Sequence, residues 1–149
     1  MKEKLKEIVA KAIRNPGAYS DLAFVYQRGH DLSGITRFEA RAGGAFTLKS
    51  DNPRRQRHSF FEGELAVDQR NAILTAIEEN HLLDVPSSTR NIGDDELPVI
   101  VELNYDDSLH RLFIWADDAH KNVGFHRFEK TLWDLLKQLS NGEVGAGAL

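Results

Sequence analysis

Two runs rich in β-branched and aromatic residues dominate the hydrophobic pattern of the chain, at residues 97–105 and 109–116. Such runs are typical of strands, and the polar residues Asp106, Asp107 and Ser108 between them predict a turn. The two strands are therefore expected to form an apolar, buried hairpin. Because two strands alone are marginally stable in water, the rest of the chain must supply more sheet and a covering layer.

Strand patterns also fill the N-terminal half of the chain. Gly43 and Gly44 can take the positive φ of a tight turn, and the polar residues 28–31 and 51–55 predict loops. The four expected strands cover residues 22–27, 35–42, 45–50 and 56–61. In the fourth strand, Phe60 and Phe61 are expected to face opposite sides. Together these strands predict an antiparallel meander.

Three helices are expected from apolar positions at helical spacing. The first covers residues 2–15, the second begins with Asp68 as its N-cap and ends near Asn80, and the last covers about residues 127–139. The apolar stripe of the first helix consists of Leu5, Ile8, Val9, Ala12 and Ile13. We expect this stripe to dock on its own chain, while a neighbouring copy or a partner are the other surfaces that can cover it.

The order of these elements predicts an α+β fold. We expect an antiparallel sheet of about six strands, a meander plus a C-terminal hairpin, with two helices on one face and an extra N-terminal helix. The expected organisation is an N-terminal amphipathic helix at residues 1–17, a single domain at 18–141 and a flexible tail at 142–149. The hairpin loop decides the position of Trp115: an odd loop puts it on the face of Val99 and Val101, and an even loop on the opposite face.

Composition narrows the function classes. The chain has 149 residues, a formal net charge of -4 and no cysteine. The charge disfavours nucleic acid and an anionic membrane surface as partners, and the missing cysteine excludes disulfides, thiolate zinc sites and cysteine nucleophiles. The N-terminus alternates charged and apolar residues, which predicts neither a signal peptide nor a membrane span, so we expect a cytoplasmic protein.

Acidic residues flank both open ends of the predicted hairpin. The start of its first strand and the end of its second lie side by side in an antiparallel pair. The residues brought together this way are Asp94, Asp95, Glu96, Asp117, Asp118 and His120. This acidic rim is a solvated strand end, a partner-contact surface, or a site for a divalent cation or acid-base chemistry.

Other catalytic or metal signatures are absent from the sequence. The six histidines never pair at i, i+4, although His120 and His126 flank one predicted loop and can converge there. No nucleophile elbow and no phosphate-binding glycine motif occurs. We therefore assign no catalytic residue, no cofactor-binding residue and no metal ligand, and expect no cofactor.

One basic patch stands out. Arg54, Arg55, Arg57 and His58 follow one another closely, Phe60 and Phe61 come next, and Arg37 and Arg41 lie on a nearby strand. Basic residues with interleaved aromatics suit single-stranded nucleic acid. An anionic protein partner and a merely solubilising loop are the other interpretations.

Three segments of the chain form a recognisable pattern: VYQRGHDLSGI at residues 25–35, NHLLDVP at residues 80–86, and an acidic loop followed by a strand hairpin and a leucine-rich helix. In this pattern the chain resembles emfourin-like proteins, small bacterial domains whose named member inhibits a thermolysin-like metallopeptidase. The likeness covers residues 22–139. The resemblance implies a small inhibitor-like domain and carries no individual site residue over to this chain.

The sequence therefore favours a non-enzymatic protein-binding module, an inhibitor, immunity or accessory protein of a bacterial enzyme. The candidate binding loops are residues 28–34 and 51–57, which are expected to be neighbours at one end of the sheet. The candidate partner-binding residues are Arg28, His30, Asp31, Arg54, Arg55 and Arg57. The alternatives are a metal-dependent protein or enzyme that uses the acidic rim, and nucleic-acid binding through the arginine patch. A homodimer is a further expectation, because an amphipathic helix and a sheet edge are both available.

Overall fold

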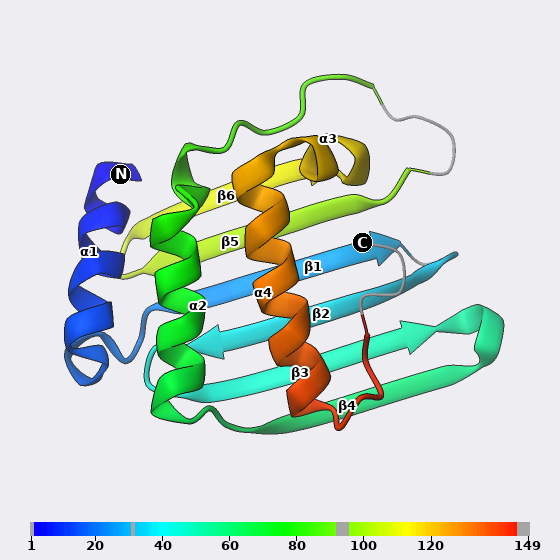
Figure 1. Ribbon diagram of the computed structural model, residues 1–149, viewed down its shortest axis with the longest axis horizontal. Helices are drawn as coiled ribbons and strands as arrows, with labels where there is room; N and C mark the ends of the chain where they lie inside the picture. Colours follow the sequence, from blue (N-terminus) through cyan, green and yellow to red (C-terminus); the bar gives the residue numbers. More distant parts are fainter. Residues whose placement is uncertain (1, 31, 92–95, 146–149) are drawn as a thin grey trace.

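The computed structural model describes residues 2–30, 32–91 and 96–145 and shows one six-stranded antiparallel sheet in the order β4-β3-β2-β1-β5-β6 (Figure 1). The strands are β1 (Ala23–His30), β2 (Gly34–Arg41), β3 (Ala45–Asn52), β4 (Arg57–Glu64), β5 (Pro98–Tyr105) and β6 (Ser108–Trp115). The first four strands form a meander, and β5 and β6 form a hairpin that joins it through β1. The predicted fold class is confirmed.

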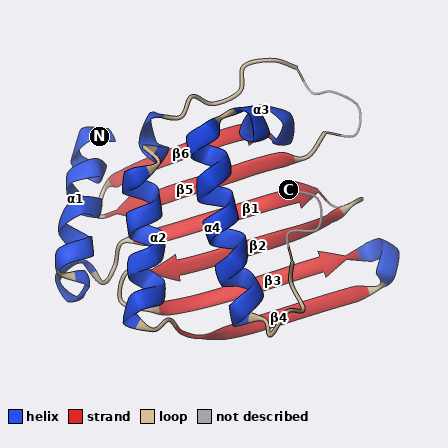
Figure 2. Cartoon of the chain, in the orientation of Figure 1, coloured by secondary structure: helices blue, strands red, loops and turns tan. Residues whose placement is uncertain are grey.

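Helices cover one face of this sheet (Figure 2). The four α-helices are α1 (Lys2–Arg14), α2 (Val67–Glu79), α3 (Ala116–Lys121) and α4 (Val123–Leu139), and three short 3₁₀ helices are η1 (Pro16–Tyr19), η2 (Pro53–Arg55) and η3 (Leu82–Asp84). Helices α2 and α4 lie side by side across the strands (Figure 1). The opposite face of the sheet carries no helix in the described part of the chain, as is common in antiparallel sheets.

The core lies between the sheet and these helices. Alternate residues of β1 point into it, and the ring centroids of Phe24 and Phe128 lie 5.9 Å apart. The stripe of α1 is also buried in this core, so the first helix docks on its own chain, against α2 and β6. Lys6 of α1 adds an ion pair with Asp84 of η3, at 2.7 Å.

The segment between the hairpin and the last helix differs from the prediction. Residues 116–121, for which no helix was expected, form α3, and α4 begins four residues earlier than expected, at Val123. Asn122 caps α4, because its side chain accepts a hydrogen bond from the backbone N–H of Phe125 at 2.9 Å. Gly124 belongs to the first turn, where a Cβ would lie 2.8 Å from the carbonyl oxygen of Asn80. Glycine here permits close packing of α4 on the end of α2.

The hairpin turn decides the position of Trp115. Tyr105 pairs with Ser108, so only Asp106 and Asp107 form the turn, with a positive φ of 50° at Asp106. This even loop places Trp115 opposite Pro98, on the face away from Val99 and the helices. Trp115 is nevertheless buried, at 8% exposed, although it lies outside the main core.

The start of α2 and the segment after α4 also differ from the prediction. Asp68 lies in the first turn of α2 rather than at its cap, and the side chain of Gln69 accepts the backbone N–H of Ala66 there. Val144, in the segment expected to be a flexible tail, is buried in the core, and its N–H donates to the hydroxyl of Ser140 at 2.9 Å. Residues 146–149 lie outside the described residues.

Candidate functional site

The two candidate loops meet at one end of the sheet, as predicted. β2 and β3 pair Ile35 with Asp51 next to the β1–β2 turn and the β3–β4 connection (Figure 1). Gly34 has a φ of 112°, and a Cβ at this position would lie 2.8 Å from the carbonyl oxygen of Asp51. A side chain would therefore be both strained and blocked, which explains why glycine lets the two segments approach.

His30 shapes the first loop. Its Nδ1 lies 3.2 Å from the backbone nitrogen of Leu32 and 3.3 Å from that of Ser33, and it accepts both N–H groups. The Ser33 backbone N–H also reaches the carbonyl oxygen of His30, at 3.2 Å. His30 therefore fixes the turn through its side chain. Asp31, the next candidate residue, lies outside the described residues.

The second loop is rigid for local reasons. Pro53 starts the 3₁₀ helix η2, and the side chain of Asn52 accepts the backbone N–H of Arg55 at 3.3 Å. Gln56 ends η2 in the left-handed region, with a φ of 51°, and its N–H bonds to the carbonyl of Pro53. Proline, a side-chain cap and a left-handed residue together hold this connection in one shape.

Three arginines project from this rigid connection. Arg54 and Arg55 belong to η2, Arg57 opens β4, and all three are exposed. None of them forms an ion pair with a residue that the structure describes. The patch does not extend to Arg37 and Arg41 as expected, because Arg37 pairs with Glu39 at 2.7 Å and Arg41 lies 3.8 Å from Asp21. We call residues 54–57 the basic connection.

An exposed aromatic residue follows the basic connection. Phe60 of β4 is 60% exposed on the face away from the helices, whereas Phe61 packs against the core. The two side chains therefore face opposite sides, as predicted. Between the arginines and Phe60, His58 pairs with Asp51 of β3 at 2.9 Å, and this contact lowers the pKa of Asp51.

Arg28 has a different place from the other candidate arginines. Its side chain lies on the helix-covered face and bonds to the carboxylate of Glu129 on α4, at 3.1 Å. Tyr26 also donates to this carboxylate, and Trp133 Nε1 donates to the Tyr26 hydroxyl at 3.0 Å. Glu129 is 1% exposed. These four residues form a buried polar network that joins β1 to α4, so Arg28 does not belong to the exposed basic connection.

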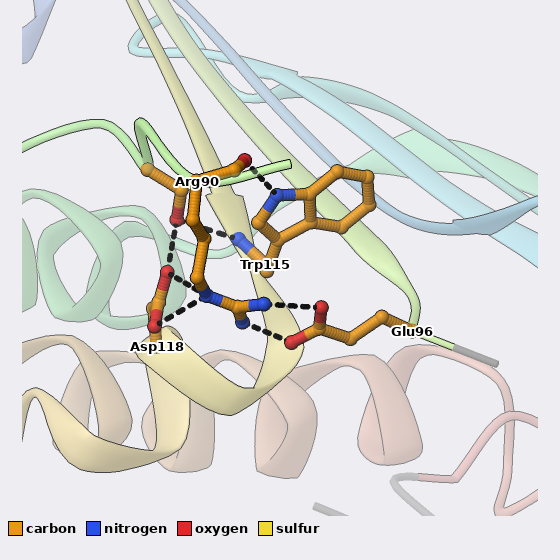
Figure 3. A network of polar contacts seen from close by, with 5 residues as sticks. Arg90, Glu96, Trp115 and Asp118 are labelled. Atoms are coloured by element: carbon orange, nitrogen blue, oxygen red, sulfur yellow. Dashed lines mark hydrogen bonds and ion pairs between the residues drawn. The ribbon is translucent and has the colours of Figure 1, made fainter. Parts of the chain in front are cut away.

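The acidic rim contains an arginine that the sequence analysis did not connect with it (Figure 3). Arg90 donates through Nε to Asp118, at 3.2 Å, and through both Nη groups to Glu96. The Asp118 carboxylate also accepts from Ser88 Oγ at 2.5 Å, and this bond, followed by Arg90, lowers the pKa of Asp118. Arg90 thus neutralises two carboxylates of the rim. Asp94 and Asp95 lie outside the described residues.

The same segment covers Trp115. The indole Nε1 donates to the carbonyl oxygen of Arg90 at 3.3 Å, and the backbone N–H of Trp115 donates to Ser88 Oγ at 3.0 Å (Figure 3). The rings of Trp115 and Phe113 meet edge to face, 4.9 Å between centroids. The segment before β5 therefore covers Trp115 on the face of the sheet away from the helices.

The histidines and carboxylates do not assemble a metal site in the described part of the chain. His120 of α3 and His126 of α4 do converge, with ring centroids 4.7 Å apart. A hollow of about 600 Å³ on the helix-free face is lined by Glu39, Glu62 and Glu64, among others. Yet no group of three His, Asp or Glu side chains that could hold an ion occurs among residues 2–30, 32–91 and 96–145.

Comparison with known proteins does not assign this chain to a family. No protein-family model matches this sequence, and no curated protein matches it. No helix within the described ranges is long and apolar enough to cross a membrane.

Proposed function

We propose that this chain is a non-enzymatic protein-binding module whose basic connection binds an acidic surface of a partner protein. One observation carries the proposal. Arg54, Arg55 and Arg57 are exposed and have no ion pair with a described residue, on a chain whose formal net charge is -4. Arg37 and Arg90 have carboxylate partners, and the other exposed arginines without an ion pair to a described residue, Arg14 and Arg127, lie singly on helices. The basic connection brings three such arginines together within four residues.

The physical properties of the basic connection suit this role. Its backbone is held by Pro53, by the cap from Asn52 and by the contact with Gly34, so binding costs little ordering of the loop. Guanidinium groups bind carboxylates through two parallel hydrogen bonds, which gives geometric specificity. A localised positive field also raises the association rate with an acidic partner, in a salt-dependent manner. These features support a preformed binding loop.

The observations favour this proposal over the two alternatives. A cation or acid-base site at the acidic rim would need several free carboxylates, but Arg90 occupies Asp118 and Glu96, which leaves Asp117 as the one carboxylate without an ion pair among the described residues of the rim. A nucleic-acid interface would need a longer basic track, but Arg37 is paired with Glu39. An inhibitor, immunity or accessory protein of a bacterial enzyme is the form of the module that the resemblance to emfourin-like proteins favours.

The test is capture of a partner by the full chain and by two matched double variants. R54A/R55A removes two positive charges from the basic connection, and R127A/K130A removes two from exposed positions of α4. We expect a stoichiometric partner from lysate of the source organism that binds the wild type and R127A/K130A, and that R54A/R55A releases at lower salt. Equal retention by both variants overturns the proposal, as does salt-sensitive binding of an oligonucleotide in place of a protein.

A further inference from the structure

The backbone groups at the two edges of the sheet differ in their hydrogen-bond partners. On the β6 edge, the backbone N–H of Ser88 donates to the carbonyl oxygen of Phe113 at 2.8 Å. The backbone N–H of Phe113 donates in turn to Ser87 Oγ, at 3.2 Å. On the β4 edge, no described segment pairs with the outer side of the strand. β4 is thus the open edge of the described structure.

The register of β4 shows which of its backbone groups face outward. The N–H of Leu65 donates to the carbonyl oxygen of Gly44 at 2.7 Å, at the end of the β3–β4 ladder. Directly hydrogen-bonded pairs alternate along an antiparallel ladder. Odd-numbered residues of β4 therefore direct their N–H and C=O groups to β3. The backbone groups of His58, Phe60 and Glu62 point to the open edge.

Charge is segregated along this edge. Arg57 and His58 stand at the start of β4, Glu62 and Glu64 at its end, and the exposed Phe60 lies between them. Edge strands are commonly protected from pairing by charged side chains, especially lysine. β4 carries no lysine, and reversing the strand around Phe60 brings His58, which also contacts Asp51 of β3, opposite Glu62.

We propose that β4 pairs antiparallel with β4 of a second copy of this chain, around a two-fold axis at Phe60. In this register His58 faces Glu62 of the other copy twice, and the two Phe60 side chains face each other. His58, Phe60 and Glu62 are also the residues whose backbone N–H and C=O groups point to the open edge. The register that brings His58 opposite Glu62 is therefore also one in which the two strands can form backbone hydrogen bonds. The two sheets then form one continuous sheet.

The charge pattern favours an antiparallel second copy of β4 over other strands. A parallel second strand would place like charges opposite one another, and a uniformly acidic segment would meet Glu62 and Glu64. The pairing leaves Arg54 and Arg55 out of the two-fold contact, so it goes beyond the proposed function and does not depend on it. The tail bonds to the covered side of β4, through Ser59 Oγ and Glu143 at 2.7 Å, and leaves His58 and Phe60 exposed.

The test is sedimentation of the full chain over a concentration series, with charge variants on β4. The wild type should reach twice its mass of 16.8 kDa. E62K removes the carboxylate that faces His58 of the other copy and puts a cationic side chain in its place, twice in each dimer, so it should weaken the dimer about tenfold. The charge swap H58E/E62K should restore the dimer. E78K, on the exposed side of α2, is the matched control and should leave it unchanged.

A cross-linking measurement checks the register. Because the chain has no cysteine, F60C introduces one thiol per copy, on the proposed two-fold axis. Paired Cα atoms across an antiparallel ladder lie about 5.5 Å apart, within reach of a disulfide. Mild oxidation should form an intermolecular disulfide in F60C, and it should form none in K49C, one strand further in. A wild type that stays monomeric throughout, or a charge swap no better than E62K, overturns the inference. So does a monomer whose captured partner is lost with E62K, because β4 then takes a strand from another protein.

Discussion

The hydroxyl of Tyr26 on β1 donates a hydrogen bond to the carboxylate of Glu129 on α4, across the centre of the core. The same carboxylate accepts from Arg28, and the same hydroxyl accepts from Trp133. A charge this deeply buried is tolerated only when it is paired and hydrogen-bonded. The buried polar network thus fixes how α4 sits on the sheet.

Removing one member of the network should be costly. E129A leaves Arg28 and the Tyr26 hydroxyl without their partner, and we expect a loss of about 3–5 kcal/mol in the free energy of unfolding. Y26F should cost about 1–3 kcal/mol, because it removes the acceptor of Trp133 and a donor to Glu129. Urea unfolding of both single variants and the double variant measures this. Additive losses would contradict direct coupling, and the exposed E79A should change stability by less than about 0.5 kcal/mol.

The network also predicts a loss of stability in alkali. Burial, followed by the neighbouring Glu129, raises the pKa of Tyr26 well above its usual value of 10.0. Above about pH 10 the unfolded chain therefore loses a proton that the folded chain keeps, and the free energy of unfolding falls as pH rises. Urea unfolding at a series of alkaline pH values should show a shallower decline for Y26F than for the wild type. Parallel declines would contradict this assignment.

Arg90 should control the environment of Trp115. R90A removes the ion pairs that hold the segment before β5 over the indole, so we expect a red-shifted and more readily quenched emission from Trp115. A W133F background leaves Trp115 as the sole tryptophan. Since Arg90 is partly exposed, the stability loss should stay near that of surface pairs, about 1 kcal/mol or less. R111A, which breaks the exposed pair with Glu102, should leave the emission unchanged.

Gly34, where the two candidate loops approach each other, should not tolerate a side chain. G34A combines a φ of 112° with a Cβ 2.8 Å from the Asp51 carbonyl, and we expect about 1–3 kcal/mol of lost stability and a displaced η2. G142A shares a positive φ of 84° but meets nothing within 4 Å, so it should cost less. Thermal unfolding compares the two. Equal costs would mean that the close approach of the two loops adds nothing.

The sheet and the long helices could be predicted because their hydrophobic periods are clear. Short α3 could not, since Ala116–Lys121 offers only one buried residue, Ala119, and little helical pattern. Gly124 lies in the first turn of α4 although glycine disfavours helices, and glycine is required there because a Cβ would lie 2.8 Å from the carbonyl oxygen of Asn80. The turn at Asp106 required a left-handed residue, which favoured two loop residues over the expected three.

The candidate residues show which sequence signals were sufficient. Arg28 follows Phe24 and Tyr26 at a spacing of two, and this phase already placed it on the buried face once β1 extended to His30. Glu129 lies on the same helical stripe as Phe125 and Leu132, which marked it as buried. The pairing of Arg90 with Asp118 had no such signal, because it depends on how the segment before β5 folds over Trp115.

The difference between the two sheet edges limits how far the sheet can grow. A sheet with two open edges can add strands without end, and repeated addition produces fibres. Here the segment at Ser87 and Ser88 occupies part of the β6 edge, and β4 is open. In the proposed dimer, each copy uses its β4 edge in a closed two-fold contact. Further growth would have to start at β6, where the segment at Ser87 and Ser88 already bonds to Phe113.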